Sequence, residues 1–338
     1  MTILLAGGSG LLGTELARSL IADGHVVRRL VRRPARRADE IEWHPERHDV
    51  PASALAGVGA VVCLSGVGVG AHRWTQPYKR AIRSSRLDPV STLAGAIASA
   101  DRKPSLVCAS AIGYYGDTGE RVVDESAPCG AGFLAELCSD WEAAADPARQ
   151  AGARVVHLRT GVVLSPRGGL LGRLRPIVRM GVGGRLGSGR QFVAWISLAD
   201  TVAAIAFLID SDLDGPINLT APNPVRNSEL VAGLARLVKR PAVIPVPKFA
   251  LRLAVGELAG EALGGQRALP ARLSAAGFEF GHPTLDEALR AARCGLPRRV
   301  VQRLRGGHEP SQAGGRSGRT PAHRRRLVAT RRAARTAA

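Results

Sequence analysis

The chain has 338 residues and a formal net charge of +19, and 45% of its residues are hydrophobic, which is typical of a globular protein. The charge is uneven: residues 293–338 hold thirteen Arg and one acid, Glu309, while the rest of the chain carries +7. This tail has few large apolar residues, so we expect it to be disordered. No basic patch with interleaved aromatic residues is present, so a nucleic-acid function is not expected.

The first 24 residues predict a strand, a glycine turn and a helix. Ile3–Ala6 forms a short apolar run, and a turn rich in glycine follows it. Apolar residues then recur at every fourth position, as the inner face of a helix requires: Leu12, Leu16 and Leu20. Asp23-Gly24 ends this helix. Strand, glycine turn and helix together form the first half of a dinucleotide-binding βαβ unit.

The three glycines of the turn have separate physical roles. Gly7 allows a tight turn, Gly10 has no Cβ to keep a pyrophosphate from the backbone N–H groups, and Gly13 lets the helix lie close to the strand. The spacing is G-x-x-G-x-x-G rather than G-x-G-x-x-G. The alternative is a plain strand–turn–helix that binds nothing, but the position between strand and helix favours the cofactor.

The end of the second strand bears on the choice of cofactor. This strand runs from His25 to Val31 and is followed by Arg32 and Arg33, with no acid before Asp39. An NAD enzyme usually has an acid here for the ribose 2′-hydroxyl, whereas an Arg suits a 2′-phosphate. We therefore expect NADP, with NAD as the alternative. The competing interpretation of Arg32 is a solvated side chain in an arginine-rich protein.

The next two strands bring candidate site residues to the ligand crevice. Ala60–Leu64 reads as a strand buried on both faces, and the loops that follow parallel strands border the crevice. Leu64, Ser65 and Gly66 are therefore expected beside the cofactor. A basic helical segment through Arg86 follows, one of whose arginines is a candidate for the pyrophosphate.

Catalytic candidates follow the strand Leu106–Ala109. Ser110 lies at its carboxyl end, where short-chain dehydrogenase-like folds place a catalytic Ser, and Tyr114 and Tyr115 are on the same loop. His157 is better explained as a core histidine. His72 and Arg73 are candidates for an anionic substrate.

Further along the chain, residues 168–189 are rich in Gly and Arg and suggest a mobile, positively charged loop over the substrate pocket. Asp200 fits the N-cap of a helix over 201–209. The last helix is expected over 284–292.

The five cysteines are odd in number and lack zinc-ligand spacing, so we expect reduced thiols and no metal site. The N-terminus lacks the basic region of a signal peptide, and the uncharged run over 50–71 is too rich in Gly to span a membrane. A cytoplasmic location is expected.

At this point the chain resembles a known family, the extended and atypical short-chain dehydrogenases/reductases. Within it, the chain is similar to the NAD(P)-dependent epimerase/dehydratase-like group that includes the epimerase family proteins of the SDR39U type. The stretches that carry the resemblance include LLAGGSGLLG, LVRRP, VVCLSG, RWTQPYKRAIRSSR, SAIGYYGDTG, FLAELCSDWEAAA, VVHLRTGVVLSPRGG, GSGRQFVAWISLAD and GPINLTAPNPVRNSEL. They cover residues 2 to about 290.

The resemblance implies an α/β protein with a Rossmann-like, doubly wound parallel sheet over residues 1–220 and a smaller C-terminal α/β substrate-side domain over 221–292. The disordered basic tail is residues 293–338. The resemblance also implies NADP binding. The cofactor neighbours that it implies are Ser9, Gly10, Leu11, Leu12, Arg32, Leu64, Ser65, Arg86 and Val163. Gly7, Gly13 and Gly66 complete the expected cofactor site.

One departure from the wider superfamily concerns catalysis. Proton transfer there uses Tyr-x-x-x-Lys on one helix, but Leu137 and Trp141 take those places here. Ser110 and Tyr114 are the catalytic candidates that remain. Two function classes stay open: an NADP-dependent oxidoreductase or nucleoside-sugar-type epimerase acting on a small polar or anionic substrate, or a non-catalytic NADP-binding sensor. A homo-oligomer is an open alternative as well.

Overall fold

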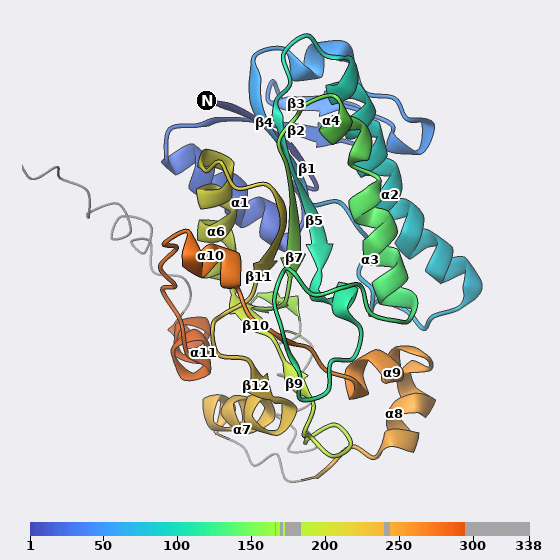
Figure 1. Cartoon of the computed structure of the whole chain (residues 1–338), viewed down its shortest axis with the longest axis vertical. Helices are drawn as coiled ribbons and strands as arrows, with labels where there is room; N and C mark the ends of the chain where they lie inside the picture. The colour runs from blue at the N-terminus through green and yellow to red at the C-terminus, as the bar shows by residue number, and fades with distance from the viewer. Residues whose placement is uncertain (166, 170–171, 173–183, 240–243, 295–338) are drawn as a thin grey trace, which may run out of the picture.

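A seven-stranded parallel sheet forms the centre of the computed structural model (Figure 1). The structure describes residues 1–294 except 166, 170–171, 173–183 and 240–243. The strand order is β11-β7-β5-β4-β1-β2-β3. The strands are β1 (Thr2–Ala6), β2 (Val26–Val31), β3 (Glu40–Glu42), β4 (Val58–Cys63), β5 (Ser105–Ala111), β7 (Val155–Thr160) and β11 (Gly215–Leu219). The order reverses beside β1, so the crevice opens at the carboxyl ends of β1 and β4.

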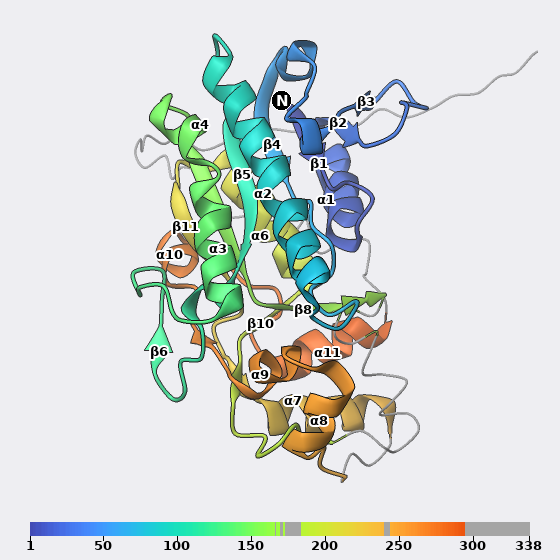
Figure 2. The same ribbon diagram turned by 90° about the vertical axis from the view of Figure 1, so that its right-hand side faces the viewer.

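Helices cover both faces of the sheet, as Figures 1 and 2 show. One face carries α1 (Leu11–Ala22) and α6 (Leu198–Asp210), which contact each other. The other face carries α2 (Gln76–Ser99), α3 (Phe133–Ala143) and α4 (Asp146–Gln150). Short 3₁₀ helices occur in the connections: η1 (Pro45–Arg47), η2 (Ala52–Leu55) and η3 (Ile112–Tyr115). The predicted doubly wound α/β fold is confirmed.

Continuous apolar runs explain why the strands are central. In β1, Ile3 and Leu5 join one core cluster, whereas Leu4 and Ala6 join the cluster on the opposite face. All four are fully buried. A strand with both faces covered needs apolar residues at every position, because successive side chains point to opposite sides.

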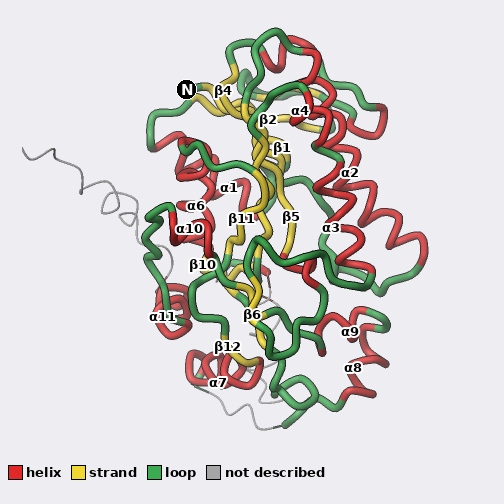
Figure 3. Tube along the Cα trace, viewed as in Figure 1, coloured by secondary structure: helices red, strands yellow, loops and turns green. Residues whose placement is uncertain are grey.

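The remaining elements form a second region below the sheet (Figure 3). Its strands pair in twos: β8 (Val162–Ser165) with β10 (Trp195–Ser197), β9 (Phe192–Val193) with β12 (Val225–Arg226), and β6 (Val122–Val123) with β13 (Arg267–Ala268). Its helices are α7 (Asn227–Val238), α8 (Lys248–Val255), α9 (Leu258–Leu263) and α11 (Leu285–Cys294), whereas the short α10 (Ala271–Ala275) lies beside β11. Helix α10 contacts β11, and Leu273 packs into a core cluster of the main sheet, so the last part of the chain returns to the first region.

The basic helical segment expected through Arg86 is part of one long helix, α2, with Pro89 inside it. Two details differ from the sequence-based expectations. The edge strand β3 was not expected. Asp200 was expected to be an N-cap, which is wrong: Ser197 caps α6 by accepting from the backbone N–H of Asp200.

The Asp200 carboxylate instead accepts hydrogen bonds from the backbone of Gly281 at 2.9 Å and His282 at 3.0 Å, and so ties the segment before α11 to α6. Hydrogen bonding to Asp200 raises the pKa of His282. Of the helices in the described part of the chain, none has the length and apolar character needed to cross a bilayer.

Candidate functional site

The glycine turn between β1 and α1 is built as its spacing predicts. Gly7 has a φ of +81°, and a Cβ there would lie 2.7 Å from the carbonyl carbon of Leu64. A Cβ on Gly13 would lie 2.3 Å from the carbonyl oxygen of Gly7. Gly13 therefore brings α1 close to the glycine turn itself. Gly10 differs: of the described residues, a Cβ there would meet only Gly7, whose carbonyl oxygen would be 3.5 Å away.

The N-terminus of α1 is left open on the side of the turn. Gly10 is its N-cap, no side chain caps it, and its first turn has no acid. The unpaired backbone N–H groups and the helix dipole favour an anion at this point. The residues present therefore fit the pyrophosphate of a dinucleotide.

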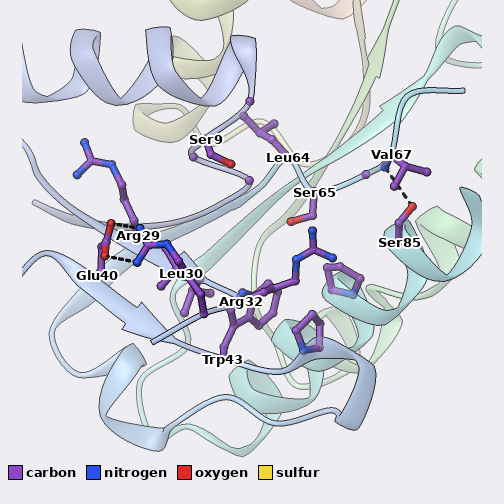
Figure 4. A pocket seen from close by; sticks show the side chains of 18 residues that line it. Ser9, Arg29, Leu30, Arg32, Glu40, Trp43, Leu64, Ser65, Val67 and Ser85 are labelled. Atoms are coloured by element: carbon purple, nitrogen blue, oxygen red, sulfur yellow. Dashed lines mark hydrogen bonds and ion pairs between the residues drawn. The ribbon is translucent and has the colours of Figure 1, made fainter. Parts of the chain in front are cut away.

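A pocket of about 540 Å³ extends from this turn across the carboxyl ends of β1, β2 and β4 (Figure 4). Seven of the predicted cofactor residues line it: Gly7, Ser9, Gly10, Arg32, Leu64, Ser65 and Gly66. Sequence reasoning missed other lining residues, among them Trp43, Pro45, Ser85 and Pro89. Their spacing gives no signal, because they reach the pocket from separate segments.

The arginines around the end of β2 differ in their partners. Arg29 forms an ion pair with Asp39, and Arg33 donates to both carboxylate oxygens of Glu40, at 2.8 and 2.9 Å. The hydrogen bonds from Arg33 lower the pKa of Glu40 to about 2. Among the described residues, Arg32 has no hydrogen-bond or ion-pair partner. Figure 4 shows its side chain extending into the pocket toward Ser65.

Arg86 lies behind the pocket wall. Its guanidinium donates to the carbonyl oxygens of Ile82 and Val67, both at 2.9 Å, and lies 5.2 Å from the Trp141 ring. A Cβ on Gly66 would be 3.2 Å from the guanidinium carbon, so the absent side chain of Gly66 makes room for Arg86. These hydrogen bonds hold the loop after β4 from the side that faces away from the pocket.

The other predicted cofactor neighbours are apolar and lie at the edge of one core cluster. Leu11, Leu12, Leu64 and Val163 are partly buried and pack against the cluster between the sheet and helices α1 and α6. Leu11 and Leu12 open α1, and Val163 lies in β8. Arg167, just after β8, pairs with the buried Glu15 of α1 at 2.6 Å, which fixes this connection beside the turn.

Ser110 belongs to a buried polar network at the carboxyl ends of β5 and β7. Its Oγ donates to Glu142 Oε1 at 2.7 Å, and Arg159 donates to both oxygens of Glu142 at 2.8 Å. The side chains of Arg159 and Glu142 are 4% and 13% exposed. Burial opposes ionisation of Glu142, but the bonds and charge of Arg159 outweigh it and lower the pKa of this carboxyl.

The two tyrosines after β5 have different surroundings. Tyr115 is buried, accepts from Arg159 at 3.1 Å and donates to Asn218 at 2.7 Å, and burial raises its pKa to about 12. Tyr114 is half-buried, and its ring stacks 3.5 Å from the Arg159 guanidinium carbon. The network thus brings Ser110 and Tyr114 to the same arginine.

The positions that would hold the Tyr and Lys of the superfamily are apolar and buried. Leu137 is 2% exposed and Trp141 is 6% exposed. His157 is also a core residue: its Nε2 accepts from Arg149, its Nδ1 lies 3.3 Å from the Cys108 sulfur, and burial lowers its pKa to about 4. None of these three is placed to exchange a proton with a ligand at neutral pH.

Glu142 and Arg159 were not recognised as a pair from the sequence. Arg159 gave a signal, since it lies in a buried strand and a buried charge requires a partner. Glu142 gave none, because α3 has other polar residues as well. Elsewhere, His72 and Arg73 line a separate open hollow near the start of α2. Most of the expected loop over 168–189, and the tail from residue 295, lie outside the described residues.

This geometry defines a class: a Rossmann-like fold with the glycine turn and crevice of the NAD(P)-binding short-chain dehydrogenases/reductases. The model of the NAD dependent epimerase/dehydratase family matches residues 3–219, and a domain of unknown function, DUF1731, matches residues 246–292. The chain belongs to the NAD dependent epimerase/dehydratase family.

Relatives of this chain cover most of its length. An epimerase family protein of Mycobacterium bovis is 50% identical over 289 residues, which are 85% of this chain and 96% of that protein. The epimerase family protein SDR39U1 of Bos taurus is 36% identical over 86% of this chain and 99% of its own length.

Two solved structures extend the comparison. Human SDR39U1, isoform 2, solved with NADPH, has a TM-score of 0.80 and 31% identity and covers 88% of this chain and 100% of its own. A nucleoside-diphosphate sugar epimerase of Corynebacterium glutamicum has a TM-score of 0.72 and 34% identity, over 87% of this chain but 58% of its own length. The predicted family resemblance is confirmed.

Proposed function

We propose that this protein binds NADP(H) in the pocket at the glycine turn and acts as an NADP-dependent oxidoreductase or epimerase on a small polar substrate. Arg32 carries the cofactor part of this proposal. It lines the pocket and has no partner within the described part of the chain, while Asp39 and Glu40 pair with the neighbouring Arg29 and Arg33. A 2′-phosphate would supply the missing partner. The human relative solved with NADPH supports the same choice.

The other residues of the pocket have clear roles toward a dinucleotide. The open N-terminus of α1, with Gly10 as its N-cap, would bind the pyrophosphate. Ser65 and Gly66 lie beyond β4, where the cofactor would turn toward β5. When bound, the nicotinamide supplies hydride chemistry, and the protein needs only to orient it and the substrate.

A second candidate function, a non-catalytic NADP(H)-binding sensor, is favoured by two observations. The Tyr and Lys positions hold the buried Leu137 and Trp141, and the Ser110 hydroxyl is bound to Glu142. Turnover of bound NADPH by carbonyl compounds, or of NADP⁺ by alcohols, separates the two functions. Cofactor binding without turnover across both classes of compound would favour the sensor.

The cofactor proposal is tested with Arg32→Asp in a titration with NADPH and NADH. The substitution replaces the 2′-phosphate partner with a like charge, so NADPH affinity should fall about 10- to 100-fold, as expected for a charged hydrogen bond worth about 1.5–3 kcal/mol. NADH affinity should change little.

Arg36→Asp is the matched control for Arg32→Asp. Arg36 is exposed, does not line the pocket and undergoes the same change of charge. Its NADPH affinity should stay close to that of the parent protein. Equal losses for NADPH and NADH in Arg32→Asp, or equal losses in both variants, would contradict the assignment of Arg32.

A further inference from the structure

The Ser110 hydroxyl donates its proton in a hydrogen bond to Glu142. Ser110 Oγ lies 2.7 Å from Glu142 Oε1, and the same oxygen accepts from Arg159 Nε at 2.8 Å. The second carboxylate oxygen accepts from Arg159 Nη2, also at 2.8 Å. An ionised carboxylate can only accept, so Ser110 must be the donor in this hydrogen bond.

The Ser110 hydroxyl therefore has no proton left for another partner. The lone pairs of its Oγ can only accept a hydrogen bond.

We propose that Ser110 recognises a ligand group that donates a hydrogen bond, a hydroxyl in the first place, so that this site binds an alcohol in preference to the matching ketone. The inference rests on the proposed function, since it concerns the substrate side of the same crevice. A serine with a free proton would donate to a carbonyl oxygen. Here that donation would break the bond to Glu142 and leave a buried carboxylate short of one donor.

Glu142 and Arg159 are positioning residues in this arrangement. Arg159 keeps Glu142 ionised and fixed by two parallel hydrogen bonds, and Glu142 in turn sets the direction of the Ser110 hydroxyl. Glu142 follows Trp141 on α3, next to one of the two positions where the superfamily's Tyr and Lys are absent. The absence of the superfamily's Tyr and Lys is thus accompanied by a Ser110 hydroxyl that accepts a hydrogen bond from a ligand instead of donating one.

The test measures binding rather than turnover. The protein is first saturated with NADP⁺, as established by titration, and its melting temperature is then followed with matched pairs of probes at equal concentrations. Suitable pairs are 2-butanol with 2-butanone, cyclohexanol with cyclohexanone, and glycerol with dihydroxyacetone. The alcohol of at least one pair should bind about two- to tenfold more tightly than its ketone, as one net hydrogen bond predicts.

Two variants separate recognition from structure. Ser110→Ala should abolish the difference between alcohol and ketone. Tyr115→Phe is the control, because Tyr115 belongs to the same network through Arg159 but makes no hydrogen bond to Ser110 in the described structure. Its preference for the alcohol should persist.

Three outcomes would overturn the inference: ketones bind as tightly as alcohols, the preference survives Ser110→Ala, or no probe of any pair shifts the melting temperature. The last outcome counts because Ser110 is only 3% exposed, so binding also requires that a ligand reaches it. Failure to bind NADP⁺ at all would instead contradict the proposed function, and it is detected in the first titration.

Discussion

The glycine turn and the Ser110 network both lie at the carboxyl ends of the sheet strands but are built in opposite ways. At the turn, no side chain caps the start of α1, and Arg32 has no hydrogen-bond or ion-pair partner among the residues that the structure describes. In the network, Ser110, Glu142, Arg159 and Tyr115 satisfy one another. The first region has unmet binding capacity for an anion. In the second region the direction of the hydrogen bonds is fixed and few donors or acceptors remain free. This restricts the groups that it can recognise.

The largest expected effect is a loss of stability when the Ser110 network is broken. Glu142→Ala leaves Arg159 charged, 4% exposed and without its partner, so stability should fall by about 3–5 kcal/mol. Chemical denaturation of the purified protein measures this loss. The control is Glu120→Ala, which breaks a pair of similar geometry with Arg226 in which Glu120 is 61% exposed. There, little change is expected. Equal effects would mean that the network is not a buried ion pair.

The next effect concerns the shape of the turn. Gly13→Ala places a Cβ 2.3 Å from the Gly7 oxygen, so α1 must move away from the turn. We expect a loss of stability of about 1–3 kcal/mol together with more than tenfold weaker NADPH binding. Gly95→Ala in α2 is the control, since nothing lies within 4 Å of its Cβ. It should stabilise the protein slightly.

A smaller effect should separate binding from stability. Gly10→Ala has room in the protein and an extended backbone, with φ −71° and ψ 168°. Its Cβ would stand where the pyrophosphate approaches, so NADPH affinity should fall about tenfold while the melting temperature of the free protein stays the same. Unchanged affinity would place the cofactor elsewhere.

The smallest effect is expected for the basic tail. Removing residues 295–338 leaves α11 intact and should change neither the melting temperature nor the NADPH affinity, because the composition of this segment predicts no packed core. A large loss of either would mean that the tail contributes to the body. The same two measurements as for the turn variants decide the point.

Local patterns carried most of the fold prediction. The central strands β1 and β4 are apolar runs, and the turn residues Gly7, Gly10 and Gly13 follow a fixed spacing, so neither depends on distant residues. Asp200 shows the limit of such reasoning. Its place near a helix start suggested a cap, but its carboxylate is used by Gly281 and His282, more than 80 residues away in the chain.

The sequence by itself determined the Rossmann-like sheet, the family and the glycine turn, because these depend on the order and spacing of residues along the chain. Only the tertiary structure decided which side chains are free. Arg32 is available because β3 brings Asp39 and Glu40 to its neighbours, and Ser110 has its polarity because α3 and β7 bring Glu142 and Arg159 together. Pairing between charged groups is set by distance in space, and spacing along the chain does not encode it.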